Sequence, residues 1–384
     1  MTLILCILLS VSIVVALTMG VRIVRLIRRF TARSVPQLPA TDEELPTVSV
    51  CIPARDEMHA MTQCLERVIA STYPKLEIIV LDDASRDNTS ILIKSFAHSG
   101  VRFVEGAPLP DGWLGKTYAE HELCREASGD LILFLDVDTH IRPQTIDTLV
   151  ALLLAERSTM VSVLPTRDDV WRGSILFATL RYFWTILLHR PALPAVASSA
   201  WLVRREYLKE QFDDLEKLRL AVEPERLVAA QTMRQDAYRF YISTTSIGVS
   251  YEKKWRSQLE TSIRLIYPAL GGRVIQVVMA YLILALMILP FAWAPTALYF
   301  GWQASHFVAL VGAIAMITTY TCYTTRVWRK GWLVGGIVFP LVLVQELYLL
   351  TKSVYAYSTR TVTWKGRPIT GSAKSVMRPA EDAS

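Results

Sequence analysis

Charged residues are scarce in this chain, and two long stretches lack them altogether. Only 20% of the 384 residues are charged, whereas 52% are hydrophobic. Residues 2–20 and 274–323 contain no Asp, Glu, Lys or Arg, and both meet the length that a membrane-spanning helix requires. This composition excludes a chain made only of soluble domains, and it leaves room for one sizeable soluble domain between the apolar ends.

Cysteines are also few, and their spacing is irregular. Their number is odd and no Cys-x-x-Cys pair occurs among Cys6, Cys51, Cys64, Cys124 and Cys322. Neither a disulfide framework nor a zinc site is therefore indicated. The pattern fits a domain in the reducing cytoplasm.

Positive charge lies beside the apolar stretches. The first stretch is followed at once by Arg22, Arg25, Arg28, Arg29 and Arg33. A cleaved signal peptide has its positive charge in front, so we expect an uncleaved anchor, with everything from about Arg22 onward in the cytoplasm. The formal net charge of +6 then reflects attraction to anionic lipid headgroups, and nucleic acid is not an expected partner.

These patterns predict the domain organisation of a multi-pass protein of the cell membrane. The expected parts are a transmembrane anchor with its basic flank (1–33), a linker (34–46), a soluble domain (47–262) with an interfacial segment near 171–202, a membrane region (263–356) and a basic tail (357–384). Residues 271–323 predict two spans. The apolar stretch 332–350 is either a third span or a re-entrant segment, and the second alternative keeps the basic tail in the cytoplasm.

Short β-branched runs alternate with helical segments in the soluble part. The expected strands cover residues 48–52, 77–81, 101–104 and 131–135. Such a repeat predicts an α/β domain with a parallel sheet, in which ligands bind beyond the carboxyl ends of the strands. Carboxylates and an arginine follow those ends, in Pro53-Ala54-Arg55-Asp56-Glu57, Asp82-Asp83 and Asp136-Val137-Asp138.

Asp136 and Asp138 are candidate metal ligands. Alternate side chains of a strand share a face, so both carboxylates can point the same way. Hard oxygen ligands suit Mg²⁺ or Mn²⁺, and such a metal would neutralise charge on a departing diphosphate. The alternative is a pair of polar residues that end a strand at a turn.

Asp82, Asp83 and Lys116 have two interpretations each. Asp82 and Asp83 either accept hydrogen bonds from a nucleobase and ribose, or cap the following helix, a role that Asp87 also fits. Lys116 follows Gly115 at an expected helix start, where its charge and the free backbone N–H groups would suit a diphosphate. An ordinary lysine on a solvated first turn is the alternative.

Together these motifs resemble the family-2 glycosyltransferases of the GT-A fold. The resemblance covers about residues 47–165 and rests on three runs, at 50–57, at 73–89 and at 129–138. Residues 109–116 are similar to the Gly-Trp-x-Gly-Lys element of a membrane-associated subgroup that includes carotenoid-acid and hopanoid-associated glycosyltransferases, as are the C-terminal spans and the Trp364-Lys365-Gly366-Arg367 tail.

The resemblance implies a Rossmann-like domain that binds a nucleotide-sugar. It assigns nucleobase contact to Pro53, Ala54, Arg55, Glu57 and to Asp82 or Asp83, metal and ribose contact to Asp136 and Asp138, and phosphate contact to Lys116. The family also has an aspartate base, preceded by glutamate, at a helix start.

Pro224 stands where that aspartate is expected, in Ala221-Val222-Glu223-Pro224-Glu225-Arg226. Proline suits a first helical position, so the helix is expected to persist and the base to be Glu223 or Glu225. A glutamate at a helix start is also ordinary helix chemistry, which is the alternative for each of these two residues.

The segment from Lys253 to Ser257 only partly resembles the Gln-x-x-Arg-Trp element of processive members, so we expect single transfer rather than polymerisation. Trp255 would stack beside the sugar or diphosphate, or anchor the chain at the membrane interface.

The expected function is metal-dependent, inverting transfer of a hexose, with a UDP-sugar as donor, to a lipid-soluble or isoprenoid-type acceptor. The apolar anchors motivate this acceptor class. Alternatives are a polysaccharide synthase, a nucleotidyltransferase that releases diphosphate, and a membrane scaffold that has lost the base, as Pro224 suggests.

Overall fold

The computed structural model describes residues 2–32, 34–39, 41–167, 180–252, 255–328 and 330–369. The chain forms two compact units, each assembled from separate stretches of sequence. The helical unit consists of Met1–Arg29, Asp168–Leu187 and Lys254–Thr359, and the α/β unit consists of Phe30–Arg167, Leu188–Lys253 and Arg360–Ser384. The functional domain boundaries expected from the sequence stay predictions.

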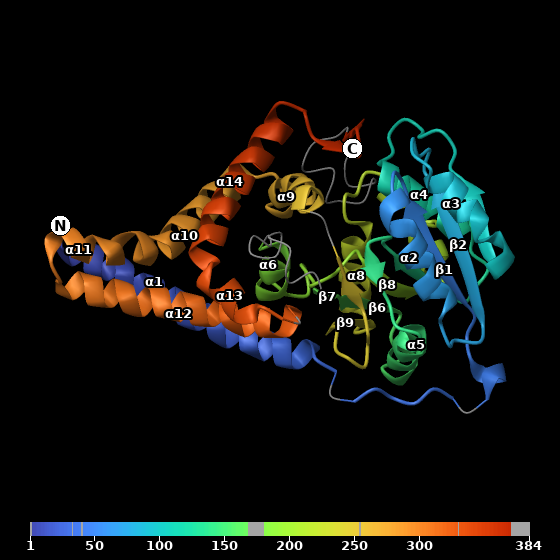
Figure 1. Ribbon diagram of the computed structural model, residues 1–384, viewed down its shortest axis with the longest axis horizontal. Coiled ribbons are helices and arrows are strands. Elements are labelled where there is room, and N and C mark those ends of the chain that lie inside the picture. Colours follow the sequence, from blue (N-terminus) through green and yellow to red (C-terminus); the bar gives the residue numbers. More distant parts are fainter. Residues whose placement is uncertain are drawn as a thin grey trace. The chain divides into compact units, whose positions relative to one another are not determined.

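A seven-stranded sheet lies at the centre of the α/β unit (Figure 1). In sheet order its strands are β3 (Val101–Glu105), β2 (Leu76–Asp82), β1 (Val48–Ala54), β4 (Leu131–Leu135), β8 (Ala200–Arg204), β6 (Met160–Leu164) and β9 (Tyr238–Ile242). The first four are parallel, whereas β8 runs antiparallel to both neighbours. The α/β fold and its four parallel strands are confirmed, and β8 makes the sheet mixed.

Helices connect and flank these strands. They are α2 (Met58–Ile69), α3 (Thr89–Ser95), α4 (Gly115–Glu126), α5 (Thr145–Ala155), α7 (Arg205–Phe212) and α8 (Pro224–Arg234). Every position of β4 and β6 is buried, as expected for strands that are covered on both faces. A second, small sheet contains β5 (Thr139–His140), β10 (Ser250–Tyr251) and β7 (Thr166–Arg167).

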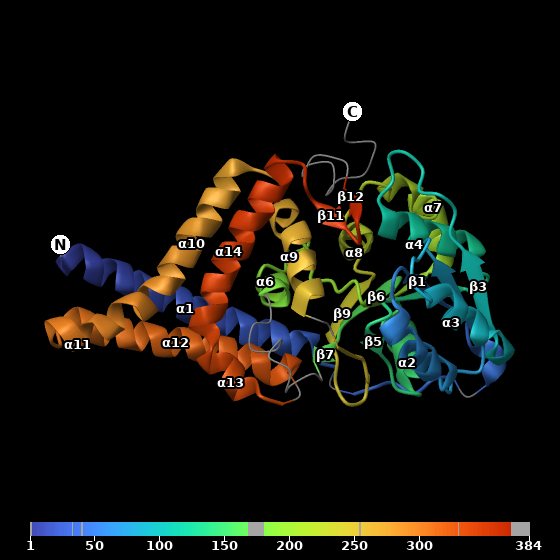
Figure 2. The ribbon, with the colours of Figure 1, turned by 45° about the horizontal axis from the view of Figure 1, so that its top comes forward.

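A hairpin is the last element that the structure describes in the α/β unit (Figure 2). Its antiparallel strands are β11 (Thr363–Trp364) and β12 (Arg367–Pro368). The turn between them consists of Lys365 and Gly366, whose φ angles of 45° and 79° are both left-handed. Two left-handed residues between paired strands form the tight turn that matches the natural twist of a hairpin.

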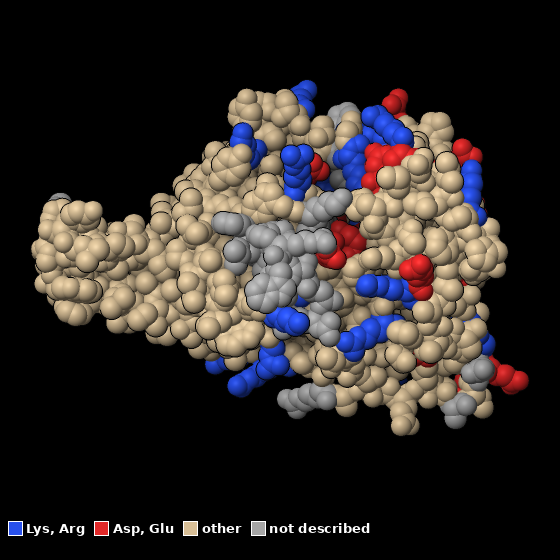
Figure 3. All heavy atoms as spheres, in the orientation of Figure 1, with Lys and Arg blue, Asp and Glu red and all other residues tan. Residues whose placement is uncertain are grey.

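The helical unit contains three helices long and apolar enough to cross a membrane, at Leu3–Phe30, Val274–Phe300 and Ala304–Val327. They correspond to α1 (Thr2–Phe30), α10 (Val274–Trp293) with α11 (Ala297–Phe300), and α12 (Ala304–Val327). The expected N-terminal and C-terminal apolar helices are thus confirmed. On the face drawn in Figure 3, the end of this unit that carries the N-terminus shows no Lys, Arg, Asp or Glu side chain.

Small and hydroxyl residues bring α1 close to its neighbours. Ser12 Oγ donates a hydrogen bond to the carbonyl of Leu286 in α10 over 2.7 Å, and Thr319 Oγ1 of α12 donates to the carbonyl of Ala16 over 3.0 Å. A Cβ atom at Gly20 would lie only 2.8 Å from Thr319 Oγ1. Close approach at small residues, with hydroxyl hydrogen bonds, is the usual way that membrane helices associate.

The remaining helices of this unit are α6 (Arg181–Leu187), α9 (Trp255–Ala269), α13 (Trp332–Ile337) and α14 (Phe339–Ser358). The third apolar stretch is thus two helices, and its membrane topology stays a prediction. Residues 171–179 of the expected interfacial segment lie outside the described residues. At its C-terminal end Ala200, Trp201 and Leu202 belong to β8 and are buried in the sheet, and the interfacial assignment of the segment stays a prediction.

Candidate active site

The register of the sheet brings the ends of β1, β2 and β4 to one edge. Ala54 pairs with Asp82 across β1 and β2, and Cys51 pairs with Phe134 across β1 and β4. Because these strands are parallel, the residues that follow their carboxyl ends gather at that edge, as the sequence predicted. The edge therefore collects the loop after Ala54, the Asp82-Asp83 pair and the segment that begins at Asp136.

The loop after β1 is tied to the loop after β2. The backbone N–H of Asp56 donates to Ser85 Oγ over 2.9 Å, and Asp56 Oδ1 accepts from the N–H of Arg86 over 2.7 Å. Glu57 N–H donates to Thr89 Oγ1 over 2.9 Å. Asp56 has a left-handed φ of 51°, which these bonds hold in place.

The candidate nucleobase residues of this loop differ in what they offer. Pro53 and Ala54 belong to β1, and the Ala54 side chain is 1% exposed in the hydrophobic core. Only backbone groups of Ala54 are therefore available to a ligand, and its carbonyl already accepts the N–H of Asp83 over 2.8 Å. Arg55 is buried, and its Nη1 donates to the Asp83 carbonyl. The alanine was predicted from the family pattern, which does not reveal which atoms face the core.

Asp82 and Asp83 are both buried, and each accepts from a different partner. Asp82 Oδ1 accepts from Ser85 Oγ. Asp83 is 3% exposed, and Arg367 Nη1 lies 2.8 and 2.7 Å from its two carboxylate oxygens. Burial raises the pKa of Asp83, against the opposing effect of Arg367 and Arg55. None of these described contacts is a helix cap.

Asp87, which precedes the N-cap residue Asn88 of α3, accepts backbone N–H groups at the start of two helices. Its Oδ1 accepts from the backbone N–H of Thr89 over 3.0 Å, and its Oδ2 accepts from the N–H of Met58 over 3.2 Å. One carboxylate thereby serves the first turns of both α3 and α2. The hydrogen bonds to Asp87 lower its pKa, although its partial burial acts in the opposite direction.

Asp136 and Asp138 lie in a turn and not on a strand, which corrects the sequence prediction. Strand β4 ends at Leu135, and the N–H of Thr139 donates to the Asp136 carbonyl over 2.9 Å. Val137 is 3% exposed and belongs to the core, whereas Asp136 and Asp138 are half-buried on either side of it. Both side chains are therefore partly accessible to a ligand, and their joint role as metal ligands stays a prediction.

The donor set suits a metal that takes part of its coordination from a ligand. Among the described residues, no group of three or more His, Cys, Asp or Glu side chains is placed to hold a metal ion. Mg²⁺ is commonly bound by one or two carboxylates together with substrate phosphates and water. The half-buried pair Asp136 and Asp138 fits that mode, and it does not fit a cage made by protein alone.

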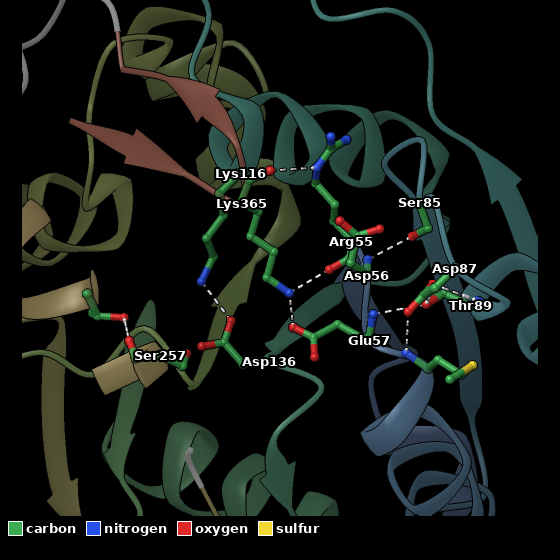
Figure 4. Close-up of polar contacts among 12 residues, drawn as sticks. Arg55, Asp56, Glu57, Ser85, Asp87, Thr89, Lys116, Asp136, Ser257 and Lys365 are labelled. Atoms are coloured by element: carbon green, nitrogen blue, oxygen red, sulfur yellow. Dashed lines mark hydrogen bonds and ion pairs between the residues drawn. The ribbon is translucent and has the colours of Figure 1, made fainter. Parts of the chain in front are cut away.

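Lys116 is directed at Asp136 from the first turn of α4 (Figure 4). Its Nζ lies 2.7 Å from Asp136 Oδ1 and 3.7 Å from Glu120 Oε1. The side chain is 15% exposed, so it does not lie on a solvated face. Burial by itself would lower the pKa of Lys116, but Asp136, Glu120 and Glu225 outweigh it and raise that pKa. The amine therefore carries its charge at neutral pH.

Glu223 and Glu225 occupy different environments at the start of α8. Pro224 takes the first helical position, as expected, and Glu223 precedes it. Glu223 Oε2 accepts from Arg226 Nε over 2.9 Å in a buried ion pair. Glu225 is 1% exposed, and its Oε1 has no hydrogen-bond partner among the described residues. An ordinary glutamate of a first helical turn would be solvated, so that alternative does not fit Glu225.

Burial raises the pKa of Glu225 to about 8. The carboxylates of Glu223 and Glu120 act in the same direction, whereas Lys116 opposes them. The Glu225 carboxyl group is thus within electrostatic range of the Lys116 ammonium and of two other carboxylates. Glu120 was not singled out in the sequence, because an acidic residue on the second turn of a helix looks solvent-exposed until the packing is known.

Trp255 begins α9 in the helical unit, while the other candidate residues lie in the α/β unit. Its contact with a donor stays a prediction. Lys253 and Lys254 lie outside the described residues. Sequence reasoning also missed Lys365 and Arg367, although the similarity of the Trp364-Lys365-Gly366-Arg367 tail to the subgroup was a signal for them.

Comparison with known proteins identifies the class of this domain. A solved mannosyltransferase, PcManGT from Pyrobaculum calidifontis in complex with GDP-Man and Mn²⁺, superposes with a TM-score of 0.55 at 18% identity, covering 90% of this chain and 99% of that chain. At this identity the likeness shows the fold alone, which is the GT-A fold. Residues 49–212 match the family described as Glycosyl transferase family 2. Within this chain, the stretch 49–212 is therefore a domain of the family-2 glycosyltransferases.

Curated relatives match shorter stretches. The chain is 36% identical over 110 residues to the Probable glycosyltransferase YdaM of Bacillus subtilis (strain 168), covering 28% of this chain and 26% of the relative. It is 30% identical over 139 residues to an Undecaprenyl-phosphate 4-deoxy-4-formamido-L-arabinose transferase of Proteus mirabilis (strain HI4320), covering 34% and 41%. A 4,4'-diaponeurosporenoate glycosyltransferase of Staphylococcus aureus (strain bovine RF122 / ET3-1) is 31% identical over 106 residues, covering 27% and 27%. The matches therefore span between 26% and 41% of these relatives' own length.

Proposed function

We propose that the protein is a membrane-bound, inverting glycosyltransferase that moves a hexose from a nucleotide-sugar to a lipid-soluble acceptor. The observation that carries this proposal is the position of Lys116, which pairs with Asp136 and lies within electrostatic reach of the buried Glu225. A cation for the leaving diphosphate and a carboxylate of raised pKa are thereby brought close together. Donor binding and proton removal are the two tasks of such a transferase.

On the donor side, Asp136 and Asp138 would hold Mn²⁺ or Mg²⁺. The bound metal would supply Lewis-acid stabilisation of the departing diphosphate. Lys116 adds a fixed positive charge for the same phosphates, and the N-terminal end of α4 adds its free backbone N–H groups. Arg55, Asp82 and the loop around Glu57 would orient the nucleobase and ribose, with a UDP-sugar as the expected donor.

On the acceptor side, Glu225 would take the proton of the attacking hydroxyl. A general base works best when its pKa lies near the working pH, and burial brings that of Glu225 to about 8. Glu223 is a weaker candidate because Arg226 already pairs with its carboxylate. Direct attack with proton transfer to Glu225 inverts the anomeric centre, and this route replaces the family aspartate at the position of Pro224.

The apolar helices support an acceptor that approaches from the bilayer. Two relatives carry isoprenoid compounds in their names, undecaprenyl phosphate and diaponeurosporenoate. An isoprenoid-type lipid is therefore the acceptor class to test first. Arginines in the C-terminal part of α1 favour a cytoplasmic α/β unit, where nucleotide-sugars are available.

The test uses the purified full chain in lipid nanodiscs with Mn²⁺, UDP- and GDP-hexoses and an isoprenoid lipid extract. We expect release of nucleoside diphosphate that depends on the lipid, and a glycolipid of one added hexose. Asp138→Ala should abolish nucleotide binding, whereas Glu225→Gln should keep binding and lose transfer. Glu210→Gln, an exposed glutamate of α7, is the matched control.

Other outcomes separate the alternatives. A product that lengthens with time would indicate a polysaccharide synthase, and release of inorganic diphosphate would indicate a nucleotidyltransferase. Nucleotide binding without transfer to any lipid tested would favour the scaffold. Absence of nucleotide binding with Mn²⁺ would refute the proposal as a whole.

A further inference from the structure

The hairpin β11 and β12 places a lysine at its tip in an unusual backbone conformation. Lys365 has a φ of 45°, a region that side chains with a Cβ atom rarely adopt, and the following Gly366 has a φ of 79°. Asn, Asp or Gly is the usual choice at the first position of this turn. Lys365 therefore occupies a strained backbone position, and strained positions cluster at sites that bind ligands.

The loop after β1 holds both sides of this tip (Figure 4). Lys365 Nζ donates to the carbonyl of Arg55 and to Glu57 Oε1. Arg55 Nε donates back to the carbonyl of Lys365 over 3.4 Å. The tip therefore sits on the loop that the family resemblance assigns to the nucleotide.

Arg367 fixes the hairpin one residue beyond the turn. Its Nη1 contacts both carboxylate oxygens of Asp83, at 2.8 and 2.7 Å, and Asp83 is 3% exposed. Arg55 Nη1 lies 4.0 Å from the same carboxylate. Two guanidinium groups therefore enclose Asp83. In this arrangement Asp83 anchors the hairpin, and Asp82 is left as the acidic residue for the nucleobase.

The Lys365 ammonium is not locked into the protein interior. Its side chain is 25% exposed, and that of its partner Glu57 is 20% exposed. Glu57 is also within electrostatic range of Asp138, one of the two candidate metal ligands. An anionic diphosphate held near Asp138 would therefore arrive among carboxylates, and it would need cations in addition to Lys116.

We propose that Lys365 is a donor-binding residue whose ammonium exchanges Glu57 for the diphosphate of the nucleotide-sugar, and that the ion pair between Arg367 and Asp83 positions it. This inference rests on the proposed function. Burial raises the pKa of Glu57, and the charge and hydrogen bond of Lys365 oppose that rise. A diphosphate carries more charge and accepts several hydrogen bonds, so it competes well for the same ammonium.

The test measures binding of UDP, UMP, GDP and GMP to the full chain in nanodiscs with Mn²⁺ by titration calorimetry. Lys365→Ala is expected to weaken binding of the diphosphate by about ten- to hundredfold, the usual effect of losing a charged hydrogen bond. Binding of the monophosphate should change less than about threefold, because it lacks the second phosphate and the added charge that would draw the ammonium from Glu57. Arg360→Ala removes an exposed cation of the same tail and should leave both affinities unchanged.

Arg367→Lys and Arg367→Met examine the positioning role. Lysine can keep the ion pair with Asp83, so Arg367→Lys should retain most of the wild-type affinity for the diphosphate. Arg367→Met, which cannot form the ion pair, should lose it. Unchanged diphosphate binding in Lys365→Ala would mean that the hairpin has only a structural role, and it would overturn the inference. Tighter binding would make the hairpin an autoinhibitory plug, which also overturns it.

The failure of this inference is distinguishable from failure of the proposed function. If the wild-type chain binds the diphosphate, Asp138→Ala loses it and Lys365→Ala keeps it, then only the role of Lys365 is wrong. If the wild-type chain binds none of these nucleotides, the proposed function itself is wrong. Melting temperatures of all variants verify that each one is folded.

Discussion

The ammonium of Lys116 lies 2.7 Å from Oδ1 of Asp136, so a cation from the first turn of α4 reaches across to the segment that follows β4. These residues are 20 positions apart in the chain. We expect Lys116→Met to raise the dissociation constant for UDP with Mn²⁺ by about ten- to hundredfold, since a charged hydrogen bond to phosphate is lost. Titration calorimetry measures this effect. Lys209→Met, an exposed lysine on α7, should behave as wild type, and equal affinities in both variants would contradict the role.

Glu225 sets the expected pH dependence of transfer. The base acts in its deprotonated form, and burial raises its pKa to about 8. The value of kcat/KM should therefore rise with pH, about tenfold per unit below pH 8, and level off above it. Initial rates between pH 5.5 and about 9.5 test this expectation. An acid limb near the ordinary glutamate pKa would exclude Glu225 as the base.

Glu120 should shift that profile without touching the substrate. Its negative charge raises the pKa of Glu225, as does that of Glu223, while Lys116 lowers it. Glu120→Gln removes one like charge, so the acid limb of kcat/KM should move to lower pH. Glu122→Gln, on the same helix, is the control and should leave the midpoint in place. A midpoint that stays in place or moves upward in Glu120→Gln would contradict this coupling.

The buried pair of Glu223 and Arg226 is expected to act on stability. Arg226 Nε lies 2.9 Å from Glu223 Oε2, and both residues are less than one tenth exposed. Breaking a buried ion pair by removing one partner commonly costs about 3–5 kcal/mol. Arg226→Met should therefore lower the melting temperature markedly, whereas Glu225→Gln should not, because it removes a charge that burial disfavours. Thermal scans at pH 8 compare the two variants, and equal losses would argue against separate roles.

Gly20 is expected to be the tightest point of the contact between α1 and α12. An added Cβ would lie 2.8 Å from Thr319 Oγ1, and the same hydroxyl donates to Ala16. Gly20→Leu should force the helices apart and lower stability by about 1–3 kcal/mol, as overpacking does. Val14→Leu, on an exposed position of α1, serves as the control. Thermal inactivation in detergent measures the difference, and a stable Gly20→Leu chain would contradict this packing.

Much of the fold could be predicted because its signals are local. Apolar runs gave the three long helices, and β-branched runs gave the four parallel strands, since side-chain period and length are visible in the sequence. The sequence did not predict β8 as a strand. It lies far along the chain from its sheet neighbour β4, and its apolar residues would also suit a membrane surface. The ends of β1, β2 and β4 were predictable as a common edge, because parallel strands place their carboxyl ends together.

The sequence by itself determined the α/β class, the apolar helices and the carboxylates at the sheet edge, because each follows from short-range periodicity or from the order of strands. Only the tertiary structure decided which of these groups meet. It separated Glu225 from Glu223, added Glu120 to the cluster of Lys116, and brought Arg367 onto Asp83 across 284 positions of sequence. Burial and ion pairing depend on neighbours that folding supplies, and the distance along the chain does not record them.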